Sequence, residues 1–157
     1  RKDGDLQFYQ IESGHKRYLA AKQAGLKKVP VIVTEIPKSD AERRLRLISM
    51  NLHTRETPKP SILANEAAIL LNSIRELREE EGLSTDMTTL TQLVAERMER
   101  STKAIEKYRQ FRKLIPKLQG LADEGASWSA LVNCSTLPPE RQEMIAFKIT
   151  AAVICLR

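Results

Sequence analysis

The sequence predicts a mainly α-helical protein, in which a small, truncated α+β part at the N-terminus precedes an all-helical part that contains a helix-turn-helix. Hydrophobic residues make up 41% of the chain but aromatic residues only 4%, so the core should be aliphatic. Strand-like alternation is confined to residues 6–36, and helical spacing of apolar residues dominates the remainder. At 157 residues, the chain can form one ordinary domain or two small ones.

A β-α-β arrangement is predicted for the N-terminal part. Residues 6–12 alternate and include aromatic and β-branched side chains, and residues 29–36 are typical of a second, more fully buried strand. A short helix should run between them from about Gly14 to Ala24, with Gly25 placed to end it. The rest of the chain is not expected to contain strands.

The next helix should begin after Ser39, which is a typical N-cap, and Glu42 completes a capping box. Residues 54–60 contain two prolines and few apolar side chains, as is typical of a hinge. We therefore predict an N-terminal domain at 1–57 and an all-helical domain at 58–157.

The second domain is expected to begin with a long amphipathic helix over residues 61–81, because apolar residues recur there at helical spacing and Gly82 follows. Further helices are predicted at about 89–98, 101–114, 116–124, 127–133 and 139–154. Trp128 is interpreted as a packing residue of the last helices rather than a platform for a base.

A helix-turn-helix is predicted at about 89–114. The two helices of this motif cross closely, which requires a small residue on the first and an aliphatic one ten positions later, as Ala95 and Ile105 provide. Ser101 is a suitable N-cap for the second helix. Glu99 stands where the tight turn usually has glycine, so the turn must be strained or altered. The alternative is a helical hairpin whose outer face is merely solvated.

The distribution of charge favours the helix-turn-helix. The chain has a formal net charge of +6 and a pI near 9.5, and residues 97–117, with eight basic and two acidic side chains, carry all of it. Side chains near the start of the second helix can reach base edges, and the other basic ones are better placed for phosphates. The predicted DNA-binding residues are Arg100, Ser101, Thr102, Lys103, Lys107, Arg109, Arg112 and Lys113.

Other classes of function are less well supported by the sequence. Cys134 and Cys155 lie in apolar surroundings far apart and are interpreted as reduced core thiols. We find no catalytic triad, no metal-ligand spacing and no carboxylate cluster, so no catalytic residue is predicted and nuclease activity is not expected. The sequence has no long apolar run or signal-like segment, which indicates a cytoplasmic protein, and it starts at Arg1, which suggests a fragment.

The stretch SGHKRYLAAKQAGLKKVPVIV, at residues 13–33, resembles the second conserved box of the ParB N-terminal domain, which opens with Gly-Glu-Arg-Arg. Asn51, in MNLHTRE, falls in the family's third box. A long helix and a helix-turn-helix follow in the family's order, and the segments LIPKLQGLADEG and LPPERQEMI are similar to the helices after them. The resemblance implies a ParB-type partition protein, a divergent member from a mobile element, with a truncated ParB/sulfiredoxin-like N-terminal part.

In that family the N-terminal domain binds CTP with Mg²⁺. The resemblance therefore implies nucleotide contacts at Gly14, His15, Lys16, Arg17 and Asn51. A glycine at a helix start, free N–H groups and two cations would suit phosphates. The sequence departs from the family pattern at these sites: His15 replaces an acidic residue, Lys16 and Leu19 replace arginines, and Met50 replaces the glutamate associated with metal and hydrolysis. The resemblance implies that Asn51 lies near the metal and the triphosphate, and it leaves the metal ligands unknown.

The leading hypothesis is a homodimeric DNA-binding protein for partition of a plasmid, chromosome or mobile element. It would bind a specific site on double-stranded DNA, associate with the bacterial nucleoid or a plasmid, and have a partition ATPase as partner. The alternatives are a CTP-dependent DNA clamp with CTPase activity, a transcriptional regulator of a mobile element, and a helical interaction scaffold without a role on nucleic acid.

Overall fold

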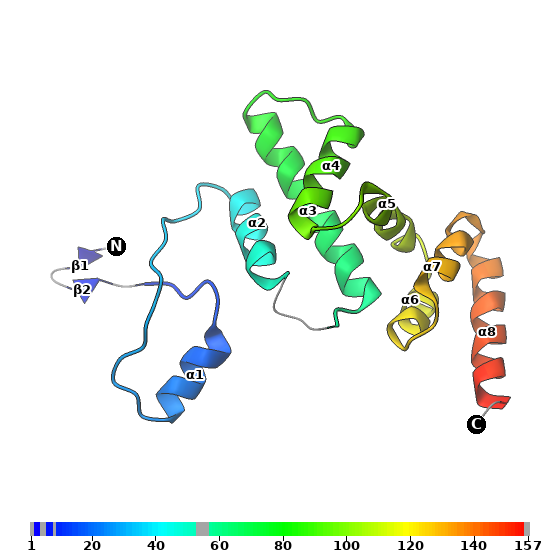
Figure 1. Cartoon of the computed structure of the whole chain (residues 1–157), viewed down its shortest axis with the longest axis horizontal. Coiled ribbons are helices and arrows are strands. Elements are labelled where there is room, and N and C mark those ends of the chain that lie inside the picture. Colours follow the sequence, from blue (N-terminus) through cyan, green and yellow to red (C-terminus); the bar gives the residue numbers. More distant parts are fainter. Residues whose placement is uncertain (1, 4–5, 8, 53–56, 156–157) are drawn as a thin grey trace. The chain divides into compact units, whose positions relative to one another are not determined.

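A computed structural model describes residues 2–3, 6–7, 9–52 and 57–155. The chain is mainly helical, as predicted (Figure 1). It divides into two compact units, residues 1–38 and residues 39–157.

The first unit contains two short strands and one helix. Strands β1 (Lys2–Asp3) and β2 (Leu6–Gln7) pair antiparallel. Helix α1 (His15–Gln23) ends where Gly25 adopts a positive φ of 70° and the Leu26 amide donates to the Ala21 carbonyl at 3.1 Å. The predicted helix and its glycine stop are therefore confirmed.

The predicted β-α-β arrangement is wrong. Of the strand expected at 6–12, Leu6–Gln7 forms a strand and residues 9–12 do not, and residues 29–36 form no strand. In that segment Val31, Ile32 and Ile36 are 73%, 94% and 82% exposed. Helix α1 buries no residue either. A strand needs a neighbour for its backbone hydrogen bonds and a layer to cover its apolar face, and the only sheet among the described residues is the β1–β2 pair.

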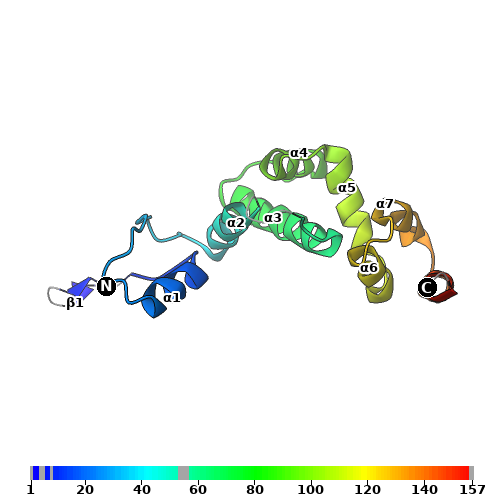
Figure 2. The same ribbon diagram turned by 60° about the horizontal axis from the view of Figure 1, so that its bottom comes forward.

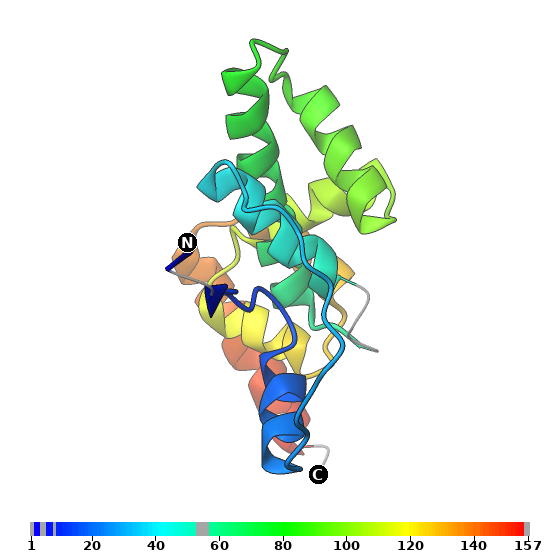
Figure 3. The ribbon, with the colours of Figure 1, turned by 90° about the vertical axis from the view of Figure 1, so that its left-hand side faces the viewer.

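The second unit begins with α2 (Asp40–Asn51), which lies against α3 (Pro60–Glu80), as Figure 3 shows. The Ser39 hydroxyl accepts from the Glu42 amide at 3.2 Å, which confirms the predicted N-cap. The guanidinium of Arg44 on α2 hydrogen-bonds the hydroxyl of buried Ser73 at 3.2 Å and also pairs with Glu76. Polar contacts thus join the two helices beside their apolar contact.

Residues 53–56 lie outside the described part of the chain, and the first three residues of the predicted hinge are among them. The domain boundary after residue 57 therefore stays a prediction. Among the described residues, α2 is in the same compact unit as α3.

Six further helical segments follow α3, close to the predicted ranges (Figure 2). They are α4 (Met87–Met98), α5 (Thr102–Phe111), α6 (Pro116–Asp123), α7 (Trp128–Leu131), the 3₁₀ helix η1 (Val132–Thr136) and α8 (Pro139–Cys155). Leu70, Leu90 and Ile105 are among the largest fully buried side chains of the aliphatic core that these helices share with α3. Cys134 is a free thiol packed against this core, as predicted, and the side chain of Cys155 lies outside the described part.

Two polar contacts join distant segments of the second unit. The Asp123 carboxylate accepts from the Ser61 amide at 3.1 Å and from the Ser61 hydroxyl, so the end of α6 caps the start of α3. Buried Gln142 on α8 accepts from the Ile115 amide at 2.9 Å and donates to the Leu137 carbonyl at 2.9 Å. Buried polar groups need such partners, so these contacts fix how the helices after α5 are placed.

Candidate nucleic-acid interface

Both helices of the predicted helix-turn-helix begin at a side-chain cap. The Asp86 carboxylate accepts from the Thr89 amide at 2.9 Å and also from the hydroxyls of Thr89 and Ser84. These hydrogen bonds, that of the Thr89 hydroxyl most of all, lower the pKa of Asp86 to about 2. The Ser101 hydroxyl accepts from the Ala104 amide at 3.2 Å, so the predicted cap of α5 is confirmed.

The turn between α4 and α5 has an altered backbone, as the missing glycine predicts. Glu99 adopts φ 53° and ψ 45°, and it is the only non-glycine residue with a positive φ in the part of the chain that the structure describes. The Arg100 amide donates to the Ala95 carbonyl at 2.9 Å and the Glu99 amide to that of Glu96 at 3.2 Å, which is the Schellman pattern of a helix end. The left-handed conformation is about 1–2 kcal/mol less stable than the right-handed one for an L-residue, so this turn lowers the stability of the folded chain.

The inner face of α5 is fully packed. Ala95 and Ile105, the pair with the predicted spacing, are both buried. Behind α5, Trp128 stacks on Tyr108 with ring centroids 5.2 Å apart and meets Phe111 edge-on at 6.3 Å. The interpretation of Trp128 as a packing residue is therefore confirmed. Helix α5 is held rigidly from behind, which is what a recognition helix requires.

Burial raises the pKa of Tyr108, and the nearby Arg100 guanidinium opposes this shift through its charge and a hydrogen bond. Arg100 is nevertheless solvent-exposed. Its side chain is thus anchored at the edge of the motif, within reach of solvent.

Apart from Arg100, the structure divides the predicted DNA-binding residues into two groups. Near the N-terminus of α5, four exposed side chains form one polar and basic face, which we call the α5 tip: Ser101, Thr102, Lys103 and Lys107. Arg109 is only partly exposed, and its guanidinium pairs with the Glu106 carboxylate at 2.7 Å. The second group, Arg109, Arg112 and Lys113, lines a groove instead of extending the α5 tip.

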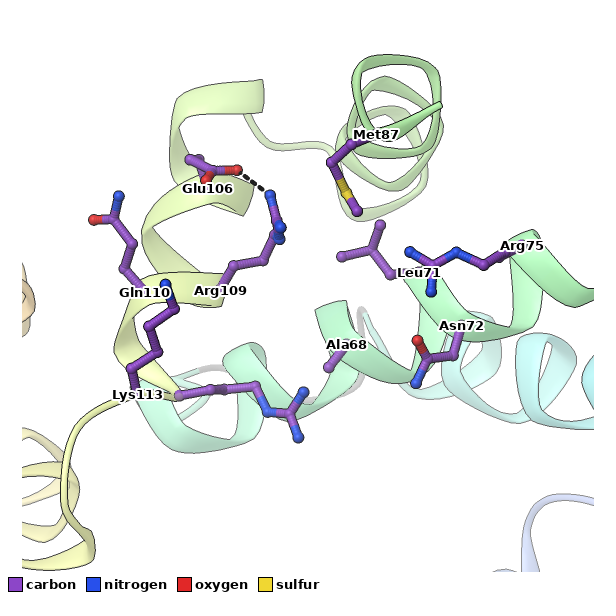
Figure 4. A pocket seen from close by; sticks show the side chains of 10 residues that line it. Ala68, Leu71, Asn72, Arg75, Met87, Glu106, Arg109, Gln110 and Lys113 are labelled. Carbon is purple, nitrogen blue, oxygen red and sulfur yellow. Dashed lines mark hydrogen bonds and ion pairs between the residues drawn. The ribbon is translucent and has the colours of Figure 1, made fainter. Parts of the chain in front are cut away.

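This groove, which we call the α3–α5 groove, has a volume of about 250 Å³ (Figure 4). Arg75 from α3 and Arg109 from α5 both reach into it, and Met87 reaches in from α4. Its complete lining is Ala68, Leu71, Asn72, Arg75, Met87, Glu106, Arg109, Gln110, Arg112 and Lys113. Asn72 and Arg75 were missed by sequence reasoning, because they look like ordinary solvated positions of an amphipathic helix.

The start of α1 brings together four of the five implied nucleotide-binding residues. Gly14 precedes the helix with φ 87° and ψ 19°, and no side chain caps the helix. The Arg17 guanidinium lies over Gly14, about 3.5 Å from where a Cβ would stand. His15 and Lys16 are exposed beside it. This helix start therefore has the free N–H groups and cations that an anion needs.

The fifth implied residue, Asn51, is in the other compact unit, at the end of α2, and its amide donates to the Leu47 carbonyl at 2.7 Å. Met50 beside it offers no ligand for a hard cation. Within the described ranges there is no group of three or more His, Cys, Asp or Glu side chains that could hold a metal ion. The residues present fit an anion at α1 but not a magnesium centre.

Comparison with known families matches residues 1–52 to the model of the ParB N-terminal domain. Residues 1–52 are therefore similar to a ParB N-terminal domain. The match confirms the ParB-type resemblance of the sequence and covers the segment from β1 through α2. Comparison with curated proteins and with solved structures found no match. The ParB match ends before α4, so the helix-turn-helix is supported by its own geometry alone. No helix in the described ranges is long and apolar enough to span a membrane.

Proposed function

We propose that this ParB-like chain binds a specific site on double-stranded DNA through the helix-turn-helix formed by α4 and α5. The observation that carries the proposal is the exposed, basic α5 tip above a fully buried inner face. An α-helix presented in this way fits the major groove, where Lys103 and Lys107 can reach base edges. Arg100 at the edge of the motif is placed for a phosphate.

The direct test of this proposal replaces both lysines of the α5 tip, Lys103→Ala with Lys107→Ala. The matched control removes two lysines of the other compact unit, Lys27→Ala with Lys28→Ala. Binding to a labelled duplex is measured by fluorescence anisotropy from about 50 to 200 mM salt. The first variant should bind more weakly and with a flatter salt dependence, because two cations are removed from the interface, while the control keeps the parent slope. Equal behaviour of the two variants would remove the assignment.

The ParB N-terminal domain supports a role in partition of a plasmid, chromosome or mobile element, together with a partition ATPase. We infer a homodimer, since helix-turn-helix proteins bind paired half-sites about one helical turn apart. Selection from random duplexes should then yield a palindromic or repeated site, and a single half-site bound by one chain would contradict the dimer. Loss of plasmid retention on deletion would support partition, whereas normal retention with altered transcription would indicate a regulator.

A second candidate function is nucleotide binding at α1, favoured by the left-handed Gly14 and the cations at an uncapped helix start. There the backbone amides and Arg17 would hold phosphates of CTP. Calorimetry with CTP, with and without magnesium, tests it. Heat that disappears in Lys16→Ala with Arg17→Ala supports binding, and the absence of heat with the parent chain rejects it. Because Met50 replaces an acidic residue, we expect no CTP turnover.

A further inference from the structure

The α3–α5 groove carries positive charge that the fold itself does not neutralise. Four cations and one carboxylate line it. The carboxylate, Glu106, is 2.7 Å from Arg109, whereas Arg75, Arg112 and Lys113 form no ion pair with any residue of the described ranges. The groove therefore keeps three unpaired cations beside the apolar side chains of Leu71 and Met87.

Such an arrangement favours an anion. Like charges gathered beside low-dielectric, apolar side chains repel one another, and a bound anion removes that repulsion. Guanidinium groups match phosphate oxygens with paired N–H donors, and the Asn72 amide adds another donor. At about 250 Å³ the groove is smaller than a usual small-molecule pocket of roughly 300–1,000 Å³, and half of its lining residues are charged, so it suits a single phosphate group.

The position of the groove indicates where this phosphate would come from. Arg109, Arg112 and Lys113 belong to the C-terminal half of α5 and the turn after it, directly along the helix from the α5 tip. A duplex that receives the α5 tip in its major groove presents a sugar-phosphate strand at the rim of that groove. The same docking that the proposed function requires thus brings a backbone phosphate toward α3.

We propose that the α3–α5 groove binds a backbone phosphate of the DNA, with Arg75 of α3 as a ligand that lies outside the helix-turn-helix. The proposal rests on the proposed DNA-binding function and extends it to α3. Glu106 limits the positive charge of the groove, because its carboxylate pairs with the Arg109 guanidinium. Since a phosphate contact carries no base information, the groove strengthens binding equally on specific and random duplexes.

The first test compares Arg75→Ala with Arg141→Ala, which removes an exposed arginine of α8. Arg75→Ala should weaken binding several-fold on both specific and random duplexes and lower the salt slope by about 1, and Arg75→Lys should fall between it and the parent. Arg141→Ala should leave both quantities unchanged. Thermal unfolding checks that the variants fold. A salt slope and affinity in Arg75→Ala equal to those of Arg141→Ala overturn the proposal.

The second test uses Glu106→Gln, which releases Arg109 and removes the only carboxylate of the groove. It should raise affinity several-fold, and the gain should shrink when Arg75→Ala is also present, because both changes act on one phosphate. Weaker binding by Glu106→Gln, or a gain that is the same without Arg75, counts against a shared site.

Two further outcomes separate the sources of failure. If Lys103→Ala with Lys107→Ala weakens binding but Arg75→Ala does not, the groove proposal fails and the DNA-binding function stands. If the parent chain binds no duplex at all, the proposed function itself fails. Titration with inorganic phosphate, followed by NMR of the arginine side chains, distinguishes free phosphate from DNA: tight binding of the free ion without an Arg75 effect on duplex binding would reject the DNA source.

Discussion

The two compact units differ in how completely they bury their own apolar side chains. In the first unit, α1 has no buried residue and residues 29–36 expose several large aliphatic side chains. In the second unit, apolar side chains from α2 through α8 form one core, in which Phe111 and Leu118 are fully buried. Yet the family match begins in the first unit and stops before the helix-turn-helix. A segment can thus match a family model without burying its own apolar side chains.

The units also differ in the range of their polar contacts. The described sheet joins strands a few residues apart, whereas Asp123 and Gln142 in the helical unit bond residues far away in the sequence. Long-range contacts of this kind make a structure cooperative, since each segment loses a partner when another unfolds.

Removal of a large core side chain should separate the units most clearly. Phe111→Ala is expected to lower the free energy of unfolding by about 3–5 kcal/mol, because it leaves a cavity beneath Trp128. Ile32→Ala in the first unit should change it by less than about 0.5 kcal/mol, because Ile32 is exposed. Urea unfolding followed by the fluorescence of Trp128 and by circular dichroism measures both. If Phe111→Ala does not fold, Phe111→Leu gives a smaller loss in the same direction. A large effect of Ile32→Ala would show that residues 29–36 are covered and would remove the contrast.

Loss of the long-range amide should have the next largest effect. Gln142→Ala leaves the Ile115 amide and the Leu137 carbonyl without their partner, which should cost about 1–3 kcal/mol because both groups are partly buried. Glu143→Ala is the matched control on the same helix, since its exposed pair with Lys117 at 3.7 Å should contribute less than about 0.5 kcal/mol. Chemical unfolding compares the two. Similar midpoints for both variants would mean that Gln142 does not join the helices.

The turn of the helix-turn-helix should respond in the opposite direction. Glu99→Gly removes the strain of a left-handed backbone, and after the added entropy of the unfolded glycine it should stabilise the chain by about 0.5–1 kcal/mol. Glu99→Ala keeps the Cβ and should give no such gain. Thermal unfolding would show a higher Tm for the glycine variant only. A lower Tm for Glu99→Gly would mean that the side chain of Glu99 contributes more than its backbone costs.

The smallest effect should come from the pH dependence of the α4 cap. The pKa of Asp86 is about 2 in the folded chain against its usual 3.8, so the stabilisation is complete above about pH 4 and is lost as the pH falls through 2. Amide exchange at Thr89 should therefore accelerate in that range. Asp86→Asn still caps the helix but cannot titrate there, so its exchange should lack this step. A step of equal size in both variants would assign it to another carboxylate.

The helical unit could be predicted well because its signals are local. Ser39, Ser101 and Glu99 mark helix ends through the hydrogen bonds and backbone angles of their own neighbourhoods. The strand at 29–36 could not be judged in this way, because apolar alternation does not say whether a partner strand is present. Arg75 was missed for a related reason: which side of α3 borders a groove depends on how α5 crosses it.

The contact between Ser61 and Asp123 has a consequence for the path of folding. It brings together residues 62 positions apart in sequence, and in between lies the whole helix-turn-helix. The chain between Ser61 and Asp123 must close into a loop before this contact can form. The contact should therefore form late in folding and should set the rate at which the last helices dock. A peptide that ends after α5 would lose the contact between Ser61 and Asp123. It would also lose the packing of the Trp128 ring against α5. Helix α5 would then be present without the contact between Ser61 and Asp123 that joins the start of α3 to the end of α6.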